Sequence, residues 1–250
     1  MADKLFKTKG IVLKAVKYGE TSLIVTILTE LFGVQSYLVN GVRSSSKKGS
    51  GKANLFQPSA LLDLVVYHNE LKQLNRIKEF RWSVLYNGIL SDVSKNAVAL
   101  FMVELLTRCL KQPESNASLF EFVEDCLLDL DNGDAVVSAN LSLFFALHLA
   151  YFFGIAPQPM PSDIDPSTLY FDLQDSVFTN TKPFHPYFIE GKAAAITADL
   201  LLVRRPLELT EIKLNQDLRR QLLKVYEQYY AMHIQDFGVL KTIPVLSTLF

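Results

Sequence analysis

The chain has few of the residues that build disulfide frameworks and metal sites. Its 250 residues include two cysteines, Cys109 and Cys126, and four histidines. Neither a CxxC nor an HExxH spacing occurs. Both cysteines lie in apolar, helix-like segments, where a cysteine is ordinarily a buried, reduced thiol. We therefore expect no disulfide, no metal site and no cofactor.

Long apolar runs are also lacking. The longest such stretch, residues 141–156, contains His148 and is shorter than the roughly 20 residues of a transmembrane helix. We predict that it forms a buried core helix. The first ten residues, MADKLFKTKG, have no apolar segment of the kind that signal peptides carry. The expectation is a cytoplasmic protein without a membrane partner.

Catalytic motifs are missing as well. Residues 47–53 (KKGSGKA) are similar to a phosphate-binding loop, which requires GxxxxGK followed by Ser or Thr. Ser46 stands where the first glycine is needed, and Ala53 stands where the magnesium-binding hydroxyl is needed. No GxSxG sequence occurs either. We predict that the protein is not an enzyme.

Positive charge is concentrated in the first third of the chain. Residues 1–82 contain 13 lysines and arginines and six acidic residues, a net charge of +7. The whole chain has a formal net charge of −1, so the remaining residues carry −8. A contrast of this size indicates two domains with different partners, residues 1–82 and residues 83–250.

The first domain has the pattern of short β-strands linked by glycine turns. We predict strands at residues 11–16, 21–29, 34–40, 56–68 and 74–81. A segment rich in Gly, Ser and Lys, residues 41–52, predicts a long loop. Five short strands indicate a small closed barrel. An OB-fold is the commonest five-stranded solution, and an SH3-like barrel is the alternative that strand number leaves open.

The second domain has helical periodicity, because apolar residues recur every three or four positions. We predict helices at residues 94–111, 119–130, 137–153, 191–203 and 215–234, with a β-hairpin at residues 169–179. Ser118 is the expected N-cap of the second helix. The predicted fold class is α+β, an N-terminal five-stranded OB-fold barrel followed by an α-helical domain with a small β-hairpin insertion.

The uncompensated basic residues of the first domain suit a nucleic-acid backbone, because clustered lysines and arginines release the counterions of phosphates. Aromatic residues are interleaved with them, and aromatics can stack on bases, although core packing is the more common role for any one of them. We predict backbone contacts from Lys7, Lys9, Lys14, Arg43, Lys47, Lys48, Lys52, Arg76 and Lys78.

The acidic second domain contains two basic pairs. Arg204 and Arg205 are adjacent in the sequence, as are Arg219 and Arg220. Solvated helix ends explain such pairs. The functional interpretation is a surface for an acidic or carboxylate-bearing peptide.

Several short motifs in order resemble one family over nearly the whole chain. They are KGIVL at residues 9–13, YGE at 18–20, LTE at 28–30 followed by FG at 32–33, GVR at 41–43, LF at 119–120, FGIAP at 153–157, YYAMHI at 229–234 and LKT at 240–242. Each is weak alone, but together they resemble bacterial RecO recombination mediators.

The resemblance implies an OB-fold followed by a helical domain. It also implies binding to single- and double-stranded DNA, annealing of complementary strands without ATP, and help in loading recombinase onto DNA coated by single-strand-binding protein. The implied partners are a RecR-like protein, the acidic C-terminal tail of single-strand-binding protein and, in some members, a RecF-like protein. A nucleoid-associated location follows from these partners.

The chain departs from the family in one region. Many RecO proteins carry a four-cysteine zinc motif in the second domain, whereas residues 162–191 contain no cysteine. We therefore expect no zinc there. The leading hypothesis is a DNA-binding and annealing recombination mediator in DNA repair. The alternative is a protein-interaction scaffold whose DNA affinity is incidental.

Overall fold

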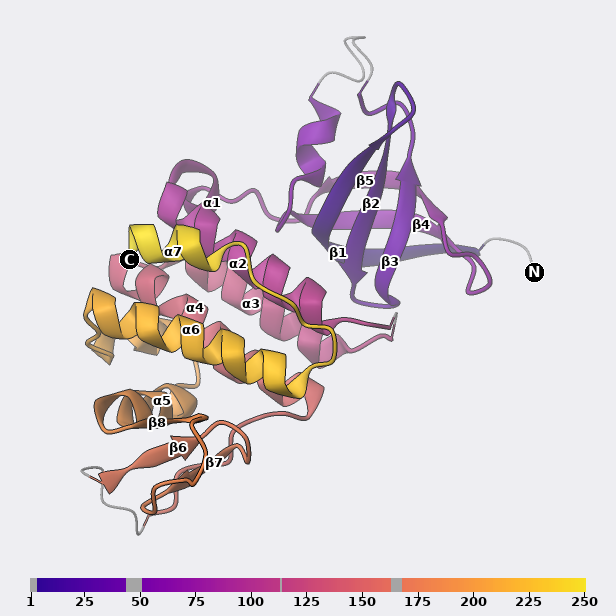
Figure 1. Cartoon of the computed structure of the whole chain (residues 1–250). Helices are drawn as coiled ribbons and strands as arrows, with labels where there is room; N and C mark the ends of the chain where they lie inside the picture. Colours follow the sequence, from indigo (N-terminus) through magenta and orange to yellow (C-terminus); the bar gives the residue numbers. More distant parts are fainter. Residues whose placement is uncertain (1–3, 44–50, 113, 163–167) are drawn as a thin grey trace. The chain divides into compact units, whose positions relative to one another are not determined.

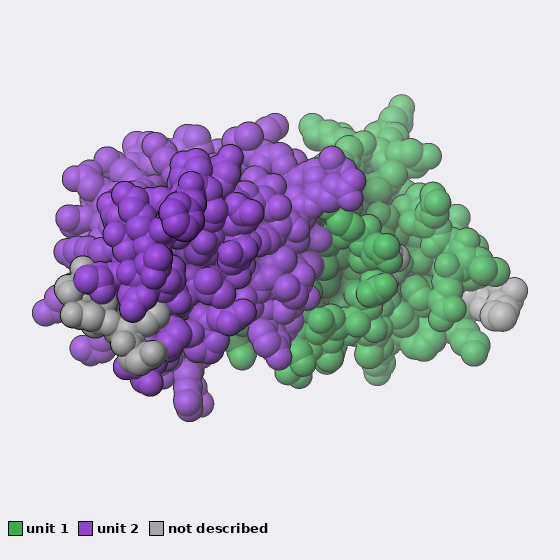
Figure 2. All heavy atoms as spheres, turned by 60° about the horizontal axis from the view of Figure 1, so that its bottom comes forward, with its two compact units in different colours: residues 1–87, 110–127 green, residues 88–109, 128–250 purple. Residues whose placement is uncertain are grey.

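The computed structural model describes residues 4–43, 51–112, 114–162 and 168–250 (Figure 1). The chain forms two compact units (Figure 2). The first unit comprises residues 1–87 and 110–127, and the second comprises residues 88–109 and 128–250. The predicted boundary after residue 82 stays a prediction.

The first unit contains a closed five-stranded barrel. Its strands are β1 (Lys4–Tyr18), β2 (Ser22–Thr29), β3 (Gly33–Val39), β4 (Leu61–His68) and β5 (Asn75–Trp82). They follow each other around the barrel in the order β1-β2-β3-β5-β4, and β4 pairs with β1 to close it. The neighbours β3 and β5 are parallel, and the other pairs are antiparallel. This is the OB-like barrel that the sequence predicts.

Strand β1 belongs to both sides of the barrel. Its first half, from Lys4 to Ile11, pairs with β4, and its second half, from Gly10 to Tyr18, pairs with β2. A β-bulge between Val12 and Lys14 interrupts the alternation, because the extra residue changes which side chains face outward. Lys7 and Lys9 therefore face outward before the bulge, and Lys14 and Val16 face outward after it.

The barrel core is built from inward positions of β1 to β4, and the partly buried Ile77, Phe80 and Trp82 of β5 pack against it. It consists of buried Val12, Leu23, Val25, Ile27, Tyr37, Val39, Leu62, Leu64 and Val66, together with Val42, Phe56 and Ala60 beside the strands. Most of these residues are aliphatic, and half of them are Val or Ile, the β-branched types that pack well on a pleated sheet. Gly10 lies on β1 where a Cβ would come within 2.7 Å of Ile27 and Leu64, so glycine permits the close approach of the strands.

The segment before β4 corrects one sequence prediction. Residues 56–68 were expected to form a single long strand, but Lys52–Phe56 is a 3-10 helix, η1, and β4 begins at Leu61. Pro58 lacks an amide donor for a strand ladder, and Ser59 has a positive φ of 70°. Phe56 is nevertheless buried, because η1 directs it into the barrel core.

The turn between β2 and β3 is held by a short polar network. The Thr29 hydroxyl donates to the Gly33 carbonyl over 2.9 Å and accepts from the Phe32 amide over 3.1 Å. Gly33 has a φ of 62°, and a Cβ at this position would lie 2.1 Å from the Glu114 carbonyl oxygen. Glycine is therefore required here by both the backbone conformation and the neighbouring segment.

The helices of the chain follow the predicted order. They are α1 (Gly88–Ser91), α2 (Val93–Cys109), α3 (Ala117–Asn132), α4 (Ala135–Leu149), α5 (Lys192–Leu202), α6 (Gln216–His233) and α7 (Ile243–Leu249), with 3-10 helices η2 (Ala150–Phe153) and η4 (Pro206–Glu211). Both cysteines are buried, as predicted. Asn116, not Ser118, caps α3, because its side-chain oxygen accepts from the Leu119 amide over 2.9 Å. Helices α1 and α7 and the 3-10 helix η4 were not predicted, whereas η2 lies within the predicted helix at residues 137–153.

Helix α4 is the centre of the second unit, and α2, α5 and α6 pack against it. Asp134 caps its N-terminus by accepting from the Val136 and Val137 amides. By length and composition alone, Ala135–Phe153 could cross a membrane, but 72% of this segment is buried inside the protein. The prediction of a buried core helix is confirmed.

A small antiparallel sheet follows in the second unit, with β6 (Tyr170–Asp172), β7 (Val177–Thr179) and β8 (Phe188–Glu190) in the order β7-β6-β8. The predicted hairpin is the β6–β7 pair, and β8 is an additional strand. Phe171 and Phe178 pack with their ring centroids 4.7 Å apart.

Within the described residues, no group of three or more His, Cys, Asp or Glu side chains is arranged to hold a metal ion.

Candidate nucleic-acid interface

The outward residues of β1, β4 and β5 form two charged rows across the barrel. In one row, Lys7 stands opposite Val65, which stands opposite Glu79. In the next row, Lys9 stands opposite Asp63, which stands opposite Arg81. Neighbouring strands lie about 4.8 Å apart, so side chains that are 72 residues apart in sequence share one surface.

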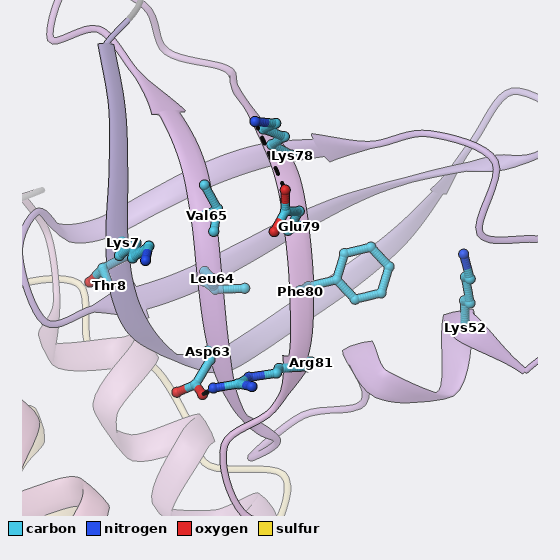
Figure 3. A pocket seen from close by; sticks show the side chains of 10 residues that line it. All are labelled: Lys7, Thr8, Lys52, Asp63, Leu64, Val65, Lys78, Glu79, Phe80 and Arg81. Atoms are coloured by element: carbon cyan, nitrogen blue, oxygen red, sulfur yellow. Dashed lines mark hydrogen bonds and ion pairs between the residues drawn. The ribbon is translucent and has the colours of Figure 1, made fainter.

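A groove of about 840 Å³ lies over these strands and η1 (Figure 3). Its lining residues are Lys7, Thr8, Lys52, Asp63, Leu64, Val65, Lys78, Glu79, Phe80 and Arg81. We call it the basic groove, because it contains four cations and two carboxylates. The structure thus brings together Lys7, Lys52 and Lys78 among the sequence-predicted contacts.

The cations of the basic groove differ in how they are paired. Arg81 donates from Nε and Nη2 to Oδ2 of Asp63, over 3.0 and 2.9 Å. Lys78 lies 3.9 Å from Glu79 Oε1, a long contact between exposed groups. Lys7 and Lys52 are exposed and form no ion pair with any described residue. These two lysines are therefore the cations most available to an incoming phosphate.

Lys9 stands outside the groove and is already engaged. Its Nζ lies 2.7 Å from Oε1 of Glu124 on α3, within the same unit. The hydrogen bond that Lys9 donates to Glu124 raises the pKa of Lys9 above its usual 10.5, outweighing the opposite effect of burial. Glu124 is only 14% exposed, so the pair is sheltered on the carboxylate side. A phosphate at Lys9 has to compete with this carboxylate.

The remaining predicted contacts on the barrel are dispersed. Lys14 is exposed on the second half of β1, and Arg76 is exposed on β5. Arg43 donates from Nη1 to the Gly19 carbonyl over 3.2 Å, beside the β1–β2 turn. Lys47 and Lys48 lie outside the described residues.

The groove also contains residues that the sequence analysis did not select. Arg81 and Asp63 are 18 residues apart, and only the β4–β5 register reveals that they are neighbours. Phe80 lies in the groove wall and points toward the side on which Lys52 stands (Figure 3). Its ring is 4.7 Å from that of Phe56 and packs against the barrel core. Phe80 is thus held by core packing.

The basic pairs of the second unit have different environments. Arg204 and Arg205 are exposed. Arg219 is only 8% exposed and donates from Nε and Nη2 to Asn140 Oδ1, each over 3.2 Å, and from Nη2 to the Leu214 carbonyl. Burial lowers the pKa of Arg219. Arg219 therefore has a structural role, and we leave it out of the peptide surface proposed below. Arg220 is half-buried.

Comparison with known proteins gives consistent matches for both parts of the chain. The family model described as Recombination protein O N terminal matches residues 1–85, and the one described as Recombination protein O C terminal matches residues 90–159. Among similar proteins is the DNA repair protein RecO of Bacteroides fragilis, 36% identical over 248 residues, which are 98% of this chain and 99% of that protein.

A second relative also matches almost the whole chain. The DNA repair protein RecO of Christiangramia forsetii is 32% identical over 246 residues, covering 98% of this chain and 99% of the relative. The two family models together span most of the chain, and the relatives match it almost end to end. The barrel and the helical unit described above are the parts that these matches cover, and the chain therefore belongs to the RecO family.

Proposed function

We propose that the protein is a DNA-binding recombination mediator in DNA repair, which anneals complementary strands without ATP. The observation that carries this proposal is the basic groove. Its exposed cations can contact phosphates, whereas its one aromatic residue, Phe80, is packed against Phe56. Such a surface holds a strand by its backbone and leaves the bases free to pair.

The physical basis of annealing is charge neutralisation. Two complementary strands repel each other through their phosphates, and each lysine or arginine that contacts a phosphate releases a condensed counterion. Lys7 and Lys52 are suited to this role because no described residue pairs with them. Arg76 and Lys78 are further cations on β5, and Lys14, Arg43, Lys47 and Lys48 extend the proposed contact set. None of this requires covalent chemistry.

Membership of the RecO family supports the proposal of partner proteins in addition to DNA. We propose that the protein acts with a RecR-like protein, and in some settings with a RecF-like protein, to help load recombinase onto DNA coated by single-strand-binding protein. For the acidic C-terminal tail of single-strand-binding protein, we propose a surface on the second unit that includes Arg204, Arg205 and Arg220. Guanidinium groups bind carboxylates strongly because they offer paired donors.

The decisive experiment is an annealing assay without ATP, using complementary strands that are naked or coated with single-strand-binding protein. Wild-type protein is expected to accelerate annealing in both cases. The double variant Lys7→Glu/Lys52→Glu is expected to bind single strands about tenfold more weakly or worse, with a salt slope shallower by about 0.7 for each lost phosphate contact. The loss is expected for all sequences alike, because backbone contacts carry no sequence information.

Lys224→Glu provides the matched control, since Lys224 is an exposed lysine on α6 of the second unit. It makes the same Lys→Glu change at one position, half the charge change of the double variant, and is expected to leave binding and annealing unchanged. Single-strand affinity that does not vary between low and moderate salt contradicts the proposal. In that case the protein acts as an interaction scaffold, and its DNA affinity is incidental.

A further inference from the structure

The connection between β7 and β8 in the second unit presents an aromatic side chain to solvent. It comprises residues 180–187, with the sequence NTKPFHPY, and we call it the aromatic loop. Phe184 is 106% exposed, more than any other large apolar residue that the structure describes. Its ring contacts no other aromatic ring among the described residues. Burial of a phenylalanine is among the larger apolar gains that a side chain can make, and here the described fold does not use it.

The residue after Phe184 fixes the aromatic loop to the sheet. His185 Nε2 lies 3.1 Å from Oδ2 of Asp172 on β6, and His185 Nδ1 accepts a hydrogen bond from the Tyr187 amide over 3.2 Å. Because Nδ1 is the acceptor, Nε2 carries the proton that is donated to Asp172. The Asp172 side chain is only 9% exposed, and its Oδ1 accepts from two backbone amides of the β6–β7 turn over 2.8 and 3.1 Å. His185 is therefore bound to a carboxylate that is itself held in place.

Further restraints act on both sides of Phe184. A proline precedes Phe184 and another follows its neighbour His185, and each proline fixes one backbone φ near −65°. The Tyr187 carbonyl accepts a hydrogen bond from the Leu173 amide over 3.0 Å. Before Phe184 in the chain, Lys182 Nζ lies 5.4 Å from the centroid of the Phe188 ring. Phe184 thus stands on a pre-organised loop, so a partner that covers it does not have to order a flexible segment.

The surroundings of the exposed ring are aromatic and include one cation. Tyr187 is 41% exposed, and Tyr170 and Phe188 on the sheet are half-buried, with their ring centroids 5.6 Å apart. Lys182 is exposed and forms no ion pair with any described residue. Residues 176–189 contain no aspartate or glutamate. The aromatic loop therefore combines an apolar anchor with a single unpaired positive charge two residues away.

We propose that the aromatic loop is a docking site for a folded partner protein, which receives Phe184 in an apolar pocket and places a carboxylate beside Lys182. A few aromatic residues that enter pockets provide most of the binding energy of a typical interface, and the residues around them exclude water. The charge on Lys182 determines which sign of charge the pocket rim carries. This inference rests on the proposed mediator function, which includes protein partners, and it assigns one of them a surface on the second unit.

The charges favour a protein partner over a nucleic acid. A phosphate backbone is bound by several cations along a track, and the aromatic loop has a single lysine. Exposed carboxylates stand at Asp175 and Glu190, before and after the loop in the sequence, and Glu190 is in register with Tyr170. The loop also differs from the arginine surface proposed above, because a free acidic tail has no pocket for a ring. A folded protein with an apolar pocket satisfies both the ring and the lysine.

The test uses the full chain and the single variants Phe184→Ala and Lys182→Glu. The probes are the purified RecR-like protein, single-strand-binding protein and recombinase of the same organism, and isothermal titration calorimetry measures each affinity. Phe184→Ala is expected to weaken binding to one of the three by about thirtyfold, the effect of truncating an aromatic anchor. Lys182→Glu is expected to weaken binding to the same protein by about fivefold at low salt and by less at high salt. Both variants are expected to bind and anneal naked strands as the wild type does, because the basic groove is unchanged.

Leu207→Ala is the matched control, because Leu207 is a 53% exposed apolar residue on η4 of the same unit, and it is expected to change no affinity. Phe184→Ala should unfold at the wild-type temperature, since its ring is fully exposed. Unchanged affinity of Phe184→Ala for all three proteins overturns the inference, as does a wild type that binds none of them.

Weaker binding of naked DNA by Phe184→Ala overturns it as well, because the ring then contacts nucleic acid. The proposed function is tested separately by Lys7→Glu/Lys52→Glu. If that variant anneals normally while Phe184→Ala loses a protein partner, the role of the basic groove fails and the docking site stands. If Phe184→Ala keeps all partners while Lys7→Glu/Lys52→Glu loses annealing, only the docking site fails.

Discussion

Asp63 lies between two cations on the outer face of the barrel. It is in register with Lys9 on β1 and with Arg81 on β5, and it accepts both hydrogen bonds of the Arg81 guanidinium on Oδ2. A phosphate that approaches Arg81 therefore meets a carboxylate already in place. We therefore expect Asp63 to lower the affinity of Arg81 for an incoming phosphate.

Asp63→Asn is expected to strengthen DNA binding. The Arg81 side chain is 81% exposed, and exposed ion pairs are worth up to about 1 kcal/mol, so the gain should reach at most about fivefold. The salt slope for single strands should steepen by about 0.7, because one more cation contacts phosphate. Titrations at several salt concentrations measure both quantities.

The gain should act through Arg81. In an Arg81→Gln background, Asp63→Asn is therefore expected to give less improvement than in the wild type, although some remains because a negative charge has still been removed. A full gain in that background, or weaker binding of Asp63→Asn itself, would show that Asp63 does not restrain Arg81.

At the scale of elements, α2 and the segment before α7 are joined by one carboxylate. Glu104 on α2 accepts hydrogen bonds from the Lys241 amide over 2.9 Å, the Thr242 amide over 2.9 Å and the Thr242 hydroxyl over 2.7 Å. Burial by itself raises the pKa of Glu104, but these hydrogen bonds outweigh it and bring the pKa below the usual 4.5. The ionised form therefore stabilises the folded unit.

Glu104→Gln is expected to reduce the free energy of unfolding by about 1–2 kcal/mol at neutral pH, since hydrogen bonds to charged groups are the stronger ones. Because the folded-state pKa is depressed, the contribution is complete above about pH 4.5 and is lost as the pH falls through the folded-state value. Urea unfolding at pH 7 and below pH 4 measures the difference. An equal deficit at both pH values would rule out the ionised carboxylate as its source.

The elements were predictable to different degrees for physical reasons. The long helices and the strands β2, β3 and β5 have clear periodicity, and they appear within a few residues of their predicted positions. Strand β1 begins at Lys4, well before the predicted residue 11, and β4 begins at Leu61 instead of residue 56. Strand β8 has three residues, too few for any period to show. Residues 56–60 were predicted as the start of a strand, although Phe56 ends η1 and β4 begins at Leu61. Phe56 and the residues after Leu61 are apolar and buried alike, and burial does not distinguish the two conformations.

The candidate site was predictable in kind but not in detail. Charge counting identified the barrel as the basic part, but the pairing of Asp63 with Arg81 depends on strand register. Arg219 and Arg204 both belong to Arg-Arg pairs in the sequence. Arg219 is nevertheless buried, and it donates hydrogen bonds to Asn140, which lies 79 residues earlier. Contacts between residues so far apart leave no local signal in the sequence.

At the scale of the whole molecule, the barrel unit is not continuous in sequence, because it includes residues 110–127. Glu124 in this segment holds Lys9, and Glu114 lies against Gly33. The outward residues Ile11, Leu28 and Leu61 are fully buried although they are not part of the barrel core. The barrel of the full chain therefore depends on more than its own strands.

A fragment of residues 1–82 is accordingly expected to be less stable than the barrel within the full chain. Each newly exposed Ile or Leu side chain costs about 1.5–3 kcal/mol, so the total loss should be several kcal/mol. Thermal unfolding and the binding of a hydrophobic dye measure the effect. A fragment that unfolds at the temperature of the full-length barrel and binds no dye would show that residues 1–82 are a self-sufficient domain.

The bulge in β1 has a consequence for how such a protein can diverge. It divides one strand into two stretches, so that Lys7 and Lys9 belong to one surface of the barrel and Lys14 and Val16 to another. Substitutions before the bulge alter the surface that β1 shares with β4 and β5, which includes the basic groove, and substitutions after it alter the surface that β1 shares with β2. Selection can therefore adjust either surface in related proteins while the other is inherited unchanged.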